Sequence, residues 1–145
     1  ILKSPHDPVF VMVDDKGTSK KGRGEKALGY IAKHPEIEVL GVVAVASNTE
    51  GAKGALVDLS ITKGREAVDS PVDKYGNPIP YGEYLVGDTV DVIEGLNIPI
   101  VVGIGDIGKM DGADDLSKRA PITTEAVREI LRRSGYLDEA RGRKN

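Results

Sequence analysis

The chain has no cysteine and no tryptophan, and only two of its 145 residues are histidines. Disulfides, thiolate zinc sites and cysteine nucleophiles are therefore excluded, and two histidines are too few for a three-histidine metal centre. Five tyrosines and one phenylalanine offer few platforms for stacking bases, and a net charge of −3 does not attract phosphate backbones. No apolar run approaches the roughly 20 residues that span a bilayer. We expect no nucleic-acid partner and no transmembrane segment.

Glycine, in contrast, is abundant, with 18 residues in the chain. Because apolar runs separate them, we interpret many of these glycines as tight turns between strands rather than as signs of disorder. The length suits a single domain over residues 1–145, and residues 138–145 are expected to form a frayed, charged tail.

The first half of the chain predicts a βαβ unit. Residues 8–13 form a short apolar run that is typical of a buried strand, and residues 25–33 have helical spacing of apolar positions. A second apolar run covers residues 37–46. A strand, a helix and a strand joined by short links imply a parallel pair with a right-handed crossover.

The second half adds further elements. Residues 55–62 alternate as in a half-exposed strand, and residues 67–72 are expected to pair with them after a turn at Lys63-Gly64. Residues 98–102 form a third buried strand. Helices are predicted to about Gly95 and over 124–133, the latter capped by Thr123, and residues 73–84 form a surface excursion. We therefore predict an α/β fold of three layers. Its mostly parallel sheet is flanked by helices and carries a small antiparallel insertion around residues 55–72.

Ligands of parallel sheets bind beyond the carboxyl ends of the strands, where this chain places several polar groups. Asp14 and Asp15 follow the first predicted strand, and Asp106 follows the third. An oxygen-only cluster of this kind suits Mg²⁺ or Ca²⁺. The alternative is that these aspartates cap helices and form turns. No other cofactor is expected.

A basic segment precedes the first predicted helix. Lys20, Lys21 and Arg23 lie where backbone N–H groups and the helix dipole favour an anion, and the alternative is a solvated, mobile basic loop. The surrounding glycines resemble a P-loop that lacks its Lys-Ser/Thr pair.

Gly103-x-Gly105-x-x-Gly108 matches the dinucleotide-binding fingerprint and follows a predicted strand. That mechanism needs a helix to open at once, and the next residues predict none, so a strand-exit loop whose glycines adopt positive φ is the alternative. The candidate ligand-binding residues of this edge are Gly103, Gly105, Lys109, Ser47 and Asn48.

The chain shows no Ser-His-Asp order and no nucleophile elbow. We therefore expect no enzymatic activity. The alternative is a Mg²⁺-dependent enzyme or regulator that binds a phosphorylated small molecule at the carboxyl edge of the sheet.

Five ordered strings carry a family resemblance: SPHDPVFVMVDD at 4–15, IEVLGVVAVASN at 37–48, GDTV at 87–90, GIGDIGKM at 103–110 and PIT at 121–123. Together they resemble the stage V sporulation protein AE family, in its small soluble form, of endospore-forming bacteria. The likeness runs from about Ser4 to Tyr136.

The resemblance implies a role beside the membrane-embedded products of one operon, which move calcium-chelated dipicolinic acid into the spore and release it in germination. It implies a position peripheral to the inner spore membrane, with other stage V sporulation A proteins as partners, and no catalytic residues. It also implies that a strand and a helix precede the start of this chain, so that one sheet edge is exposed or pairs with another copy as a homo-oligomer.

Overall fold

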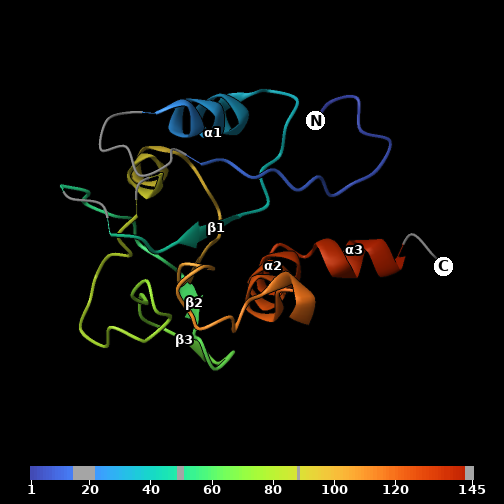
Figure 1. Ribbon diagram of the computed structural model, residues 1–145. Helices are drawn as coiled ribbons and strands as arrows, with labels where there is room; N and C mark the ends of the chain where they lie inside the picture. The colour runs from blue at the N-terminus through green and yellow to red at the C-terminus, as the bar shows by residue number, and fades with distance from the viewer. Residues whose placement is uncertain (15–21, 49–50, 88, 143–145) are drawn as a thin grey trace.

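The computed structural model describes residues 1–14, 22–48, 51–87 and 89–142. In this part of the chain a sheet of four strands has the order β1-β4-β2-β3, with β1 at Val42–Val45, β2 at Leu59–Ile61, β3 at Ala67–Val68 and β4 at Val101–Ile104 (Figure 1). The strands β1, β4 and β2 are mutually parallel, and β3 is antiparallel to β2. The predicted parallel sheet with an antiparallel insertion is confirmed.

Helices cover the two faces of this sheet and make three layers (Figure 1). Because side chains alternate along a strand, Val101 and Val102 of β4 face opposite sides. Val101 joins a core with α1 (Arg23–Lys33) and the 3-10 helix η1 (Val90–Gly95). Val102 joins a second core, in which α2 (Pro121–Arg133) packs through buried side chains such as Ile122. Full burial of each such side chain stabilises the fold by about 1.5–3 kcal/mol.

The first predicted strand does not form. Residues 9–14 have no regular secondary structure, and the side chains from Val9 to Met12 are exposed. Only Val13 packs against a core cluster. Apolar residues make a strand only where a neighbouring strand supplies the hydrogen-bond ladder, and no described strand lies beside this segment. The predicted pairing of this segment with β1 is therefore wrong, and β1 pairs with β4 instead.

Several predicted boundaries are also corrected. The strand β2 is buried rather than half-exposed, because β4 and β3 flank it and both faces are covered. The helix α2 begins at Pro121, with Ala120 in the N-cap position, so Thr123 lies inside the helix instead of capping it. Residues 138–142, predicted as frayed, belong to the helix α3 (Tyr136–Gly142). Another short 3-10 helix, η2, covers Leu116–Lys118.

No helix in the described ranges combines the length and the apolar character needed to cross a membrane.

Candidate functional site at the carboxyl edge of the sheet

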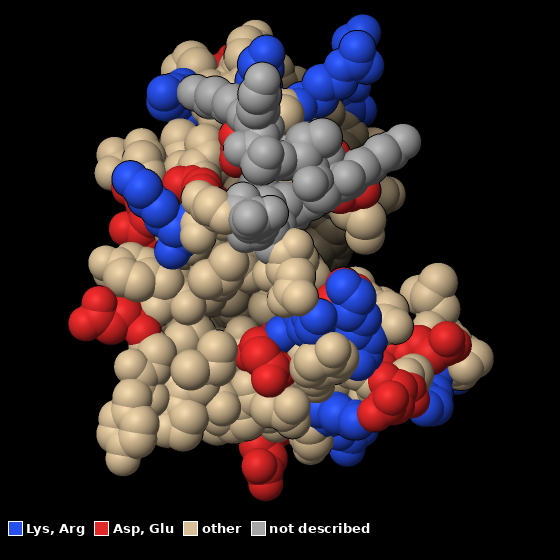
Figure 2. Space-filling model, turned by 60° about the vertical axis from the view of Figure 1, so that its left-hand side comes forward, with Lys and Arg blue, Asp and Glu red and all other residues tan. Residues whose placement is uncertain are grey.

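A cleft of about 560 Å³ opens where β1 ends. Its floor and walls come from the exit of β1, from the loop over residues 72–79 and from Val86. The lining residues are Ala46, Ser47, Asn48, Val72, Asp73, Lys74, Tyr75, Ile79 and Val86. Figure 2 shows that the middle of one face is largely uncharged, with basic side chains at the end that carries α1 and a mixed group of basic and acidic side chains at the lower right. The cleft therefore combines apolar walls with a few polar groups, as small-molecule and peptide sites do.

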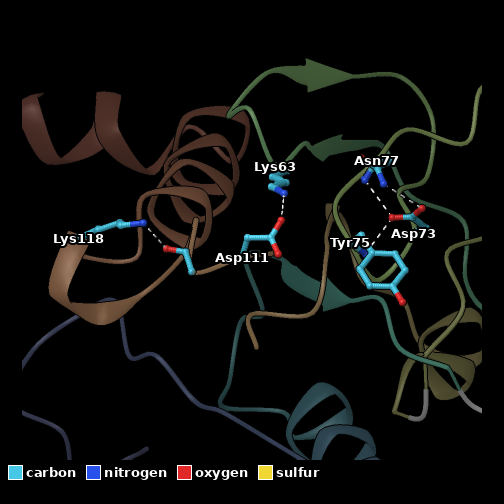
Figure 3. Close-up of polar contacts among 7 residues, drawn as sticks. Lys63, Asp73, Tyr75, Asn77, Asp111 and Lys118 are labelled. Carbon is cyan, nitrogen blue, oxygen red and sulfur yellow. Dashed lines mark hydrogen bonds and ion pairs between the residues drawn. The ribbon is translucent and has the colours of Figure 1, made fainter. Parts of the chain in front are cut away.

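Asp73 shapes the loop that walls the cleft. Its carboxylate accepts hydrogen bonds from the Tyr75 amide at 2.8 Å and from the Asn77 amide at 3.0 Å, and the Asn77 side chain adds a third at 3.3 Å (Figure 3). An aspartate that bonds the amide two residues on folds the backbone into a tight turn. The turn leaves the ring of Tyr75 half exposed, with the Lys74 ammonium 4.9 Å from the ring centre.

Backbone contacts attach this loop to the sheet. The Asp106 amide, just beyond β4, donates to the Lys74 carbonyl at 2.8 Å, and the Lys63 amide donates to the Gly76 carbonyl at 2.9 Å. A Cβ added to Gly105 would lie 2.6 Å from the Gly76 nitrogen. Only glycine permits so close an approach.

In the fingerprint Gly103-x-Gly105-x-x-Gly108, the first two positions are glycines because the surrounding atoms leave no room for a Cβ. Gly103 lies between Leu85 and the hydroxyl of Ser60, each 2.5 Å from an added Cβ. Positive φ was the predicted reason for all three glycines, and it is wrong, since none of them adopts it.

No helix follows the fingerprint, because a turn occupies residues 107–109 and the next helical element begins at Leu116. The Asp106 carboxylate accepts from the Gly108 amide at 2.9 Å and pairs with Lys109 at 3.4 Å. A dinucleotide pyrophosphate therefore finds no helix N-terminus here, as the sequence had indicated.

Two lysines make polar contacts with residues 111–112, which follow β4. Lys63 pairs with Asp111, and the ammonium of Lys118 donates to the Gly112 carbonyl at 2.7 Å (Figure 3). The hydrogen bond from Lys63, together with its positive charge, lowers the pKa of Asp111. Hydrogen bonds from Ser117 lower the pKa of Asp115 in the same way. These carboxylates thus stay ionised and structural at neutral pH.

The structure brings some of the predicted site residues together. Ser47 and Asn48 line the cleft, and Gly105 lies beside its loop. Gly103 is buried below the surface, and Lys109 is exposed and paired with Asp106.

The remaining predicted residues lie near the start of α1. Arg23 opens the helix and is exposed, and Asp14 lies against Gly24. Lys20, Lys21 and Asp15 fall outside the described residues, so the anion site stays a prediction. Among the residues that are described, no group of three or more His, Cys, Asp or Glu side chains is placed to hold a metal. The Mg²⁺ or Ca²⁺ site, which includes Asp15, likewise stays a prediction.

Sequence reasoning named two of the nine residues that line the cleft and missed seven, among them Asp73, Lys74 and Tyr75. The interval had been predicted only as a surface excursion. The signal that identifies it is an aspartate three residues before Gly76 and four before Asn77, a spacing typical of a carboxylate-stabilised turn. The cleft is therefore defined by its shape. The carboxylate of Asp73, which lines it, and that of Asp106, just beyond β4, accept hydrogen bonds from backbone amides and stabilise turns.

Neither the curated proteins nor the solved structures contain a match. The family model described as stage V sporulation protein AE1 matches residues 1–134 of the 145-residue chain. This range contains every element that forms the sheet and the cleft. The chain therefore belongs to the stage V sporulation protein AE1 family and is a sporulation protein.

Proposed function

We propose that this protein is a non-enzymatic accessory factor of sporulation and germination. It acts through contacts with other stage V sporulation A proteins at the inner spore membrane, during uptake and release of calcium dipicolinate. Family membership supports the sporulation part of this proposal.

One observation about the cleft supports action through protein contacts. Exposed apolar and aromatic side chains gather in the segment around it: Tyr75, Ile79, Tyr81, Tyr84 and Val86. Tyr81 is 99% exposed. Aromatic residues are enriched at protein interfaces, because they bury a large area at little cost in side-chain freedom. Several large exposed apolar side chains within one segment are a recognised mark of an interaction site.

A gene deletion tests the proposal in spores. We expect the deletion to lower the dipicolinate content of the spores or to slow dipicolinate release in germination. Wild-type content together with wild-type release kinetics would refute the proposed role.

Complementation with variants then tests the surface. The triple variant Tyr75→Ser, Tyr81→Ser, Tyr84→Ser removes three exposed rings while keeping the backbone hydrogen bond from residue 75 to Asp73. We expect it to fail to restore the phenotype. The matched control is Tyr30→Ser, which removes a ring that is 73% exposed on α1. Equal rescue by both variants would count against this surface.

A further inference from the structure

The strand β1 forms one edge of the sheet. On one side it pairs with β4, and on its other side the described part of the chain places no strand. The amides of Val42 and Ala46 donate to carbonyls of the β4 segment, both at 2.8 Å. Because successive amides of a strand point in opposite directions, those of Val43 and Val45 point outward. Within the described residues, neither outward amide makes a hydrogen bond.

The carboxyl end of this edge is already covered. The Ser47 amide donates to the Val86 carbonyl at 2.9 Å, and Gly87 lies against the Val45 carbonyl. The stretch from Leu40 to Ala44 therefore remains as an edge about five residues long.

An apolar segment of six residues is available to cover it. Residues 8–13, here called the N-terminal arm, place apolar side chains on both of their faces, a pattern typical of strands that are covered on both sides. Val9, Phe10, Val11 and Met12 are between 37% and 88% exposed. In Figure 1 the chain that precedes the grey segment before α1 passes below α1 and then loops out to the N-terminus. Each chain thus has a strand edge without a neighbouring strand and an apolar segment without a strand to pair with, among the residues that the structure describes.

We propose that the β1 edge of one copy is completed by the N-terminal arm of a second copy, and that the exchange is reciprocal. The inference goes beyond the proposed function and stands independently of it. The arm is anchored at its own end: Val13 packs in the core beneath α1, and a Cβ on Gly24 would lie 3.0 Å from the Asp14 backbone. This anchor holds the end of the arm in the helical layer rather than in the plane of its own sheet.

The reciprocal exchange increases the buried area of the pair. Two contacts bury twice the area that one arm buries on one edge, and a standard interface buries roughly 1,600 Å² in total. A two-fold pair satisfies both edges and both arms at once, which closes the assembly and leaves no edge for further chains.

Engineered cysteines test the proposal without interference from native thiols, because the chain has no cysteine of its own. One copy carries Val11→Cys or Val9→Cys, and the other carries Val43→Cys. Side chains on paired strands lie close enough for a disulfide. Mild oxidation of the mixture is expected to give a linked dimer of twice 15.4 kDa. The control pairs Val11→Cys with Thr124→Cys, an exposed position on α2. Linkage no greater than in this control overturns the proposal.

Two further measurements separate the alternatives. By sedimentation, we expect the unmodified chain to be a dimer and Val11→Asp to be a monomer with an unchanged circular dichroism spectrum. An unmodified chain that is monomeric at every concentration overturns the exchange. A chain carrying both Val11→Cys and Val43→Cys that closes its disulfide within one copy also overturns it, because the arm would then occupy its own edge.

Discussion

Asp114 is the residue whose replacement the structure describes most fully. It is entirely buried, and its carboxylate accepts from the Ile122 amide at 2.7 Å, from the Thr123 amide at 3.1 Å and from the Thr123 hydroxyl at 2.6 Å. The N-cap residue of α2, Ala120, has no side chain that could do this. Asp114 therefore supplies from the preceding loop the acceptors that the first turn of the helix lacks.

Replacing Asp114 with alanine leaves these donors without a partner. The Ile122 amide is buried, and an unsatisfied buried N–H costs about 2 kcal/mol. The Thr123 amide is partly buried and adds about 1 kcal/mol, whereas the hydroxyl turns toward other acceptors. We expect Asp114→Ala to lower the free energy of unfolding by about 3 kcal/mol. The corresponding drop in melting temperature is about 9 °C for a chain of this size.

Urea unfolding followed by far-ultraviolet circular dichroism measures this loss. Asp114→Asn keeps one carbonyl acceptor and should lose only about 1 kcal/mol. The control is Asp115→Ala, which removes an exposed carboxylate that accepts from the Ser117 amide at 2.8 Å and should cost less than about 1 kcal/mol. If Asp114→Ala were no more destabilised than this control, the capping role would be refuted.

Two other predictions concern stability. Gly76→Ala should lower the free energy of unfolding by about 2 kcal/mol or more, because φ is +77° and the new Cβ would lie 2.7 Å from the Met110 sulfur. Gly29→Ala, on α1 with open space around it, should instead raise the free energy of unfolding by about 0.5–1 kcal/mol. Thermal unfolding of both variants checks the pair, and equal effects would contradict the packing argument. The hydrogen bond from Arg132 lowers the pKa of Glu129. The stabilisation that this bond gives the folded chain is therefore present at neutral pH, and it is lost as the pH falls below the ordinary glutamate pKa of about 4.3. Glu129→Gln should therefore be less stable than wild type by about 0.5 kcal/mol at pH 7 and equally stable near about pH 2, and a constant difference across that range would contradict the pairing.

Local signals in the sequence were enough to predict much of the sheet. The Lys63-Gly64 turn correctly predicted the antiparallel pairing of β2 with β3, because a hairpin depends on a few neighbouring residues. The buried run over residues 98–102 likewise anticipated β4, although the strand begins and ends later, at Val101 and Ile104.

The errors arise where residues distant in the sequence decide the structure. Residues 8–13 look like a strand, yet pairing requires an edge that composition does not reveal. Thr123 looks like a cap, whereas the buried carboxylate nine residues earlier performs that role. Gly105 looked like a residue chosen for its conformation, but Gly76, 29 positions away, explains it by direct contact. Only Ser47 and Asn48 were placed at the cleft from sequence, because they follow the run predicted as a strand over residues 37–46, of which Val42–Val45 form β1.

The contact between Gly105 and Gly76 also determines how the cleft is able to bind. The loop over residues 72–79 meets the exit of β4 through backbone atoms and a hydrogen bond to Lys74, and the Met110 sulfur packs against both glycines. These contacts attach the wall of the cleft to the exit of β4. A side chain that entered would meet a hollow already formed, so we expect little loss of ordering entropy on binding.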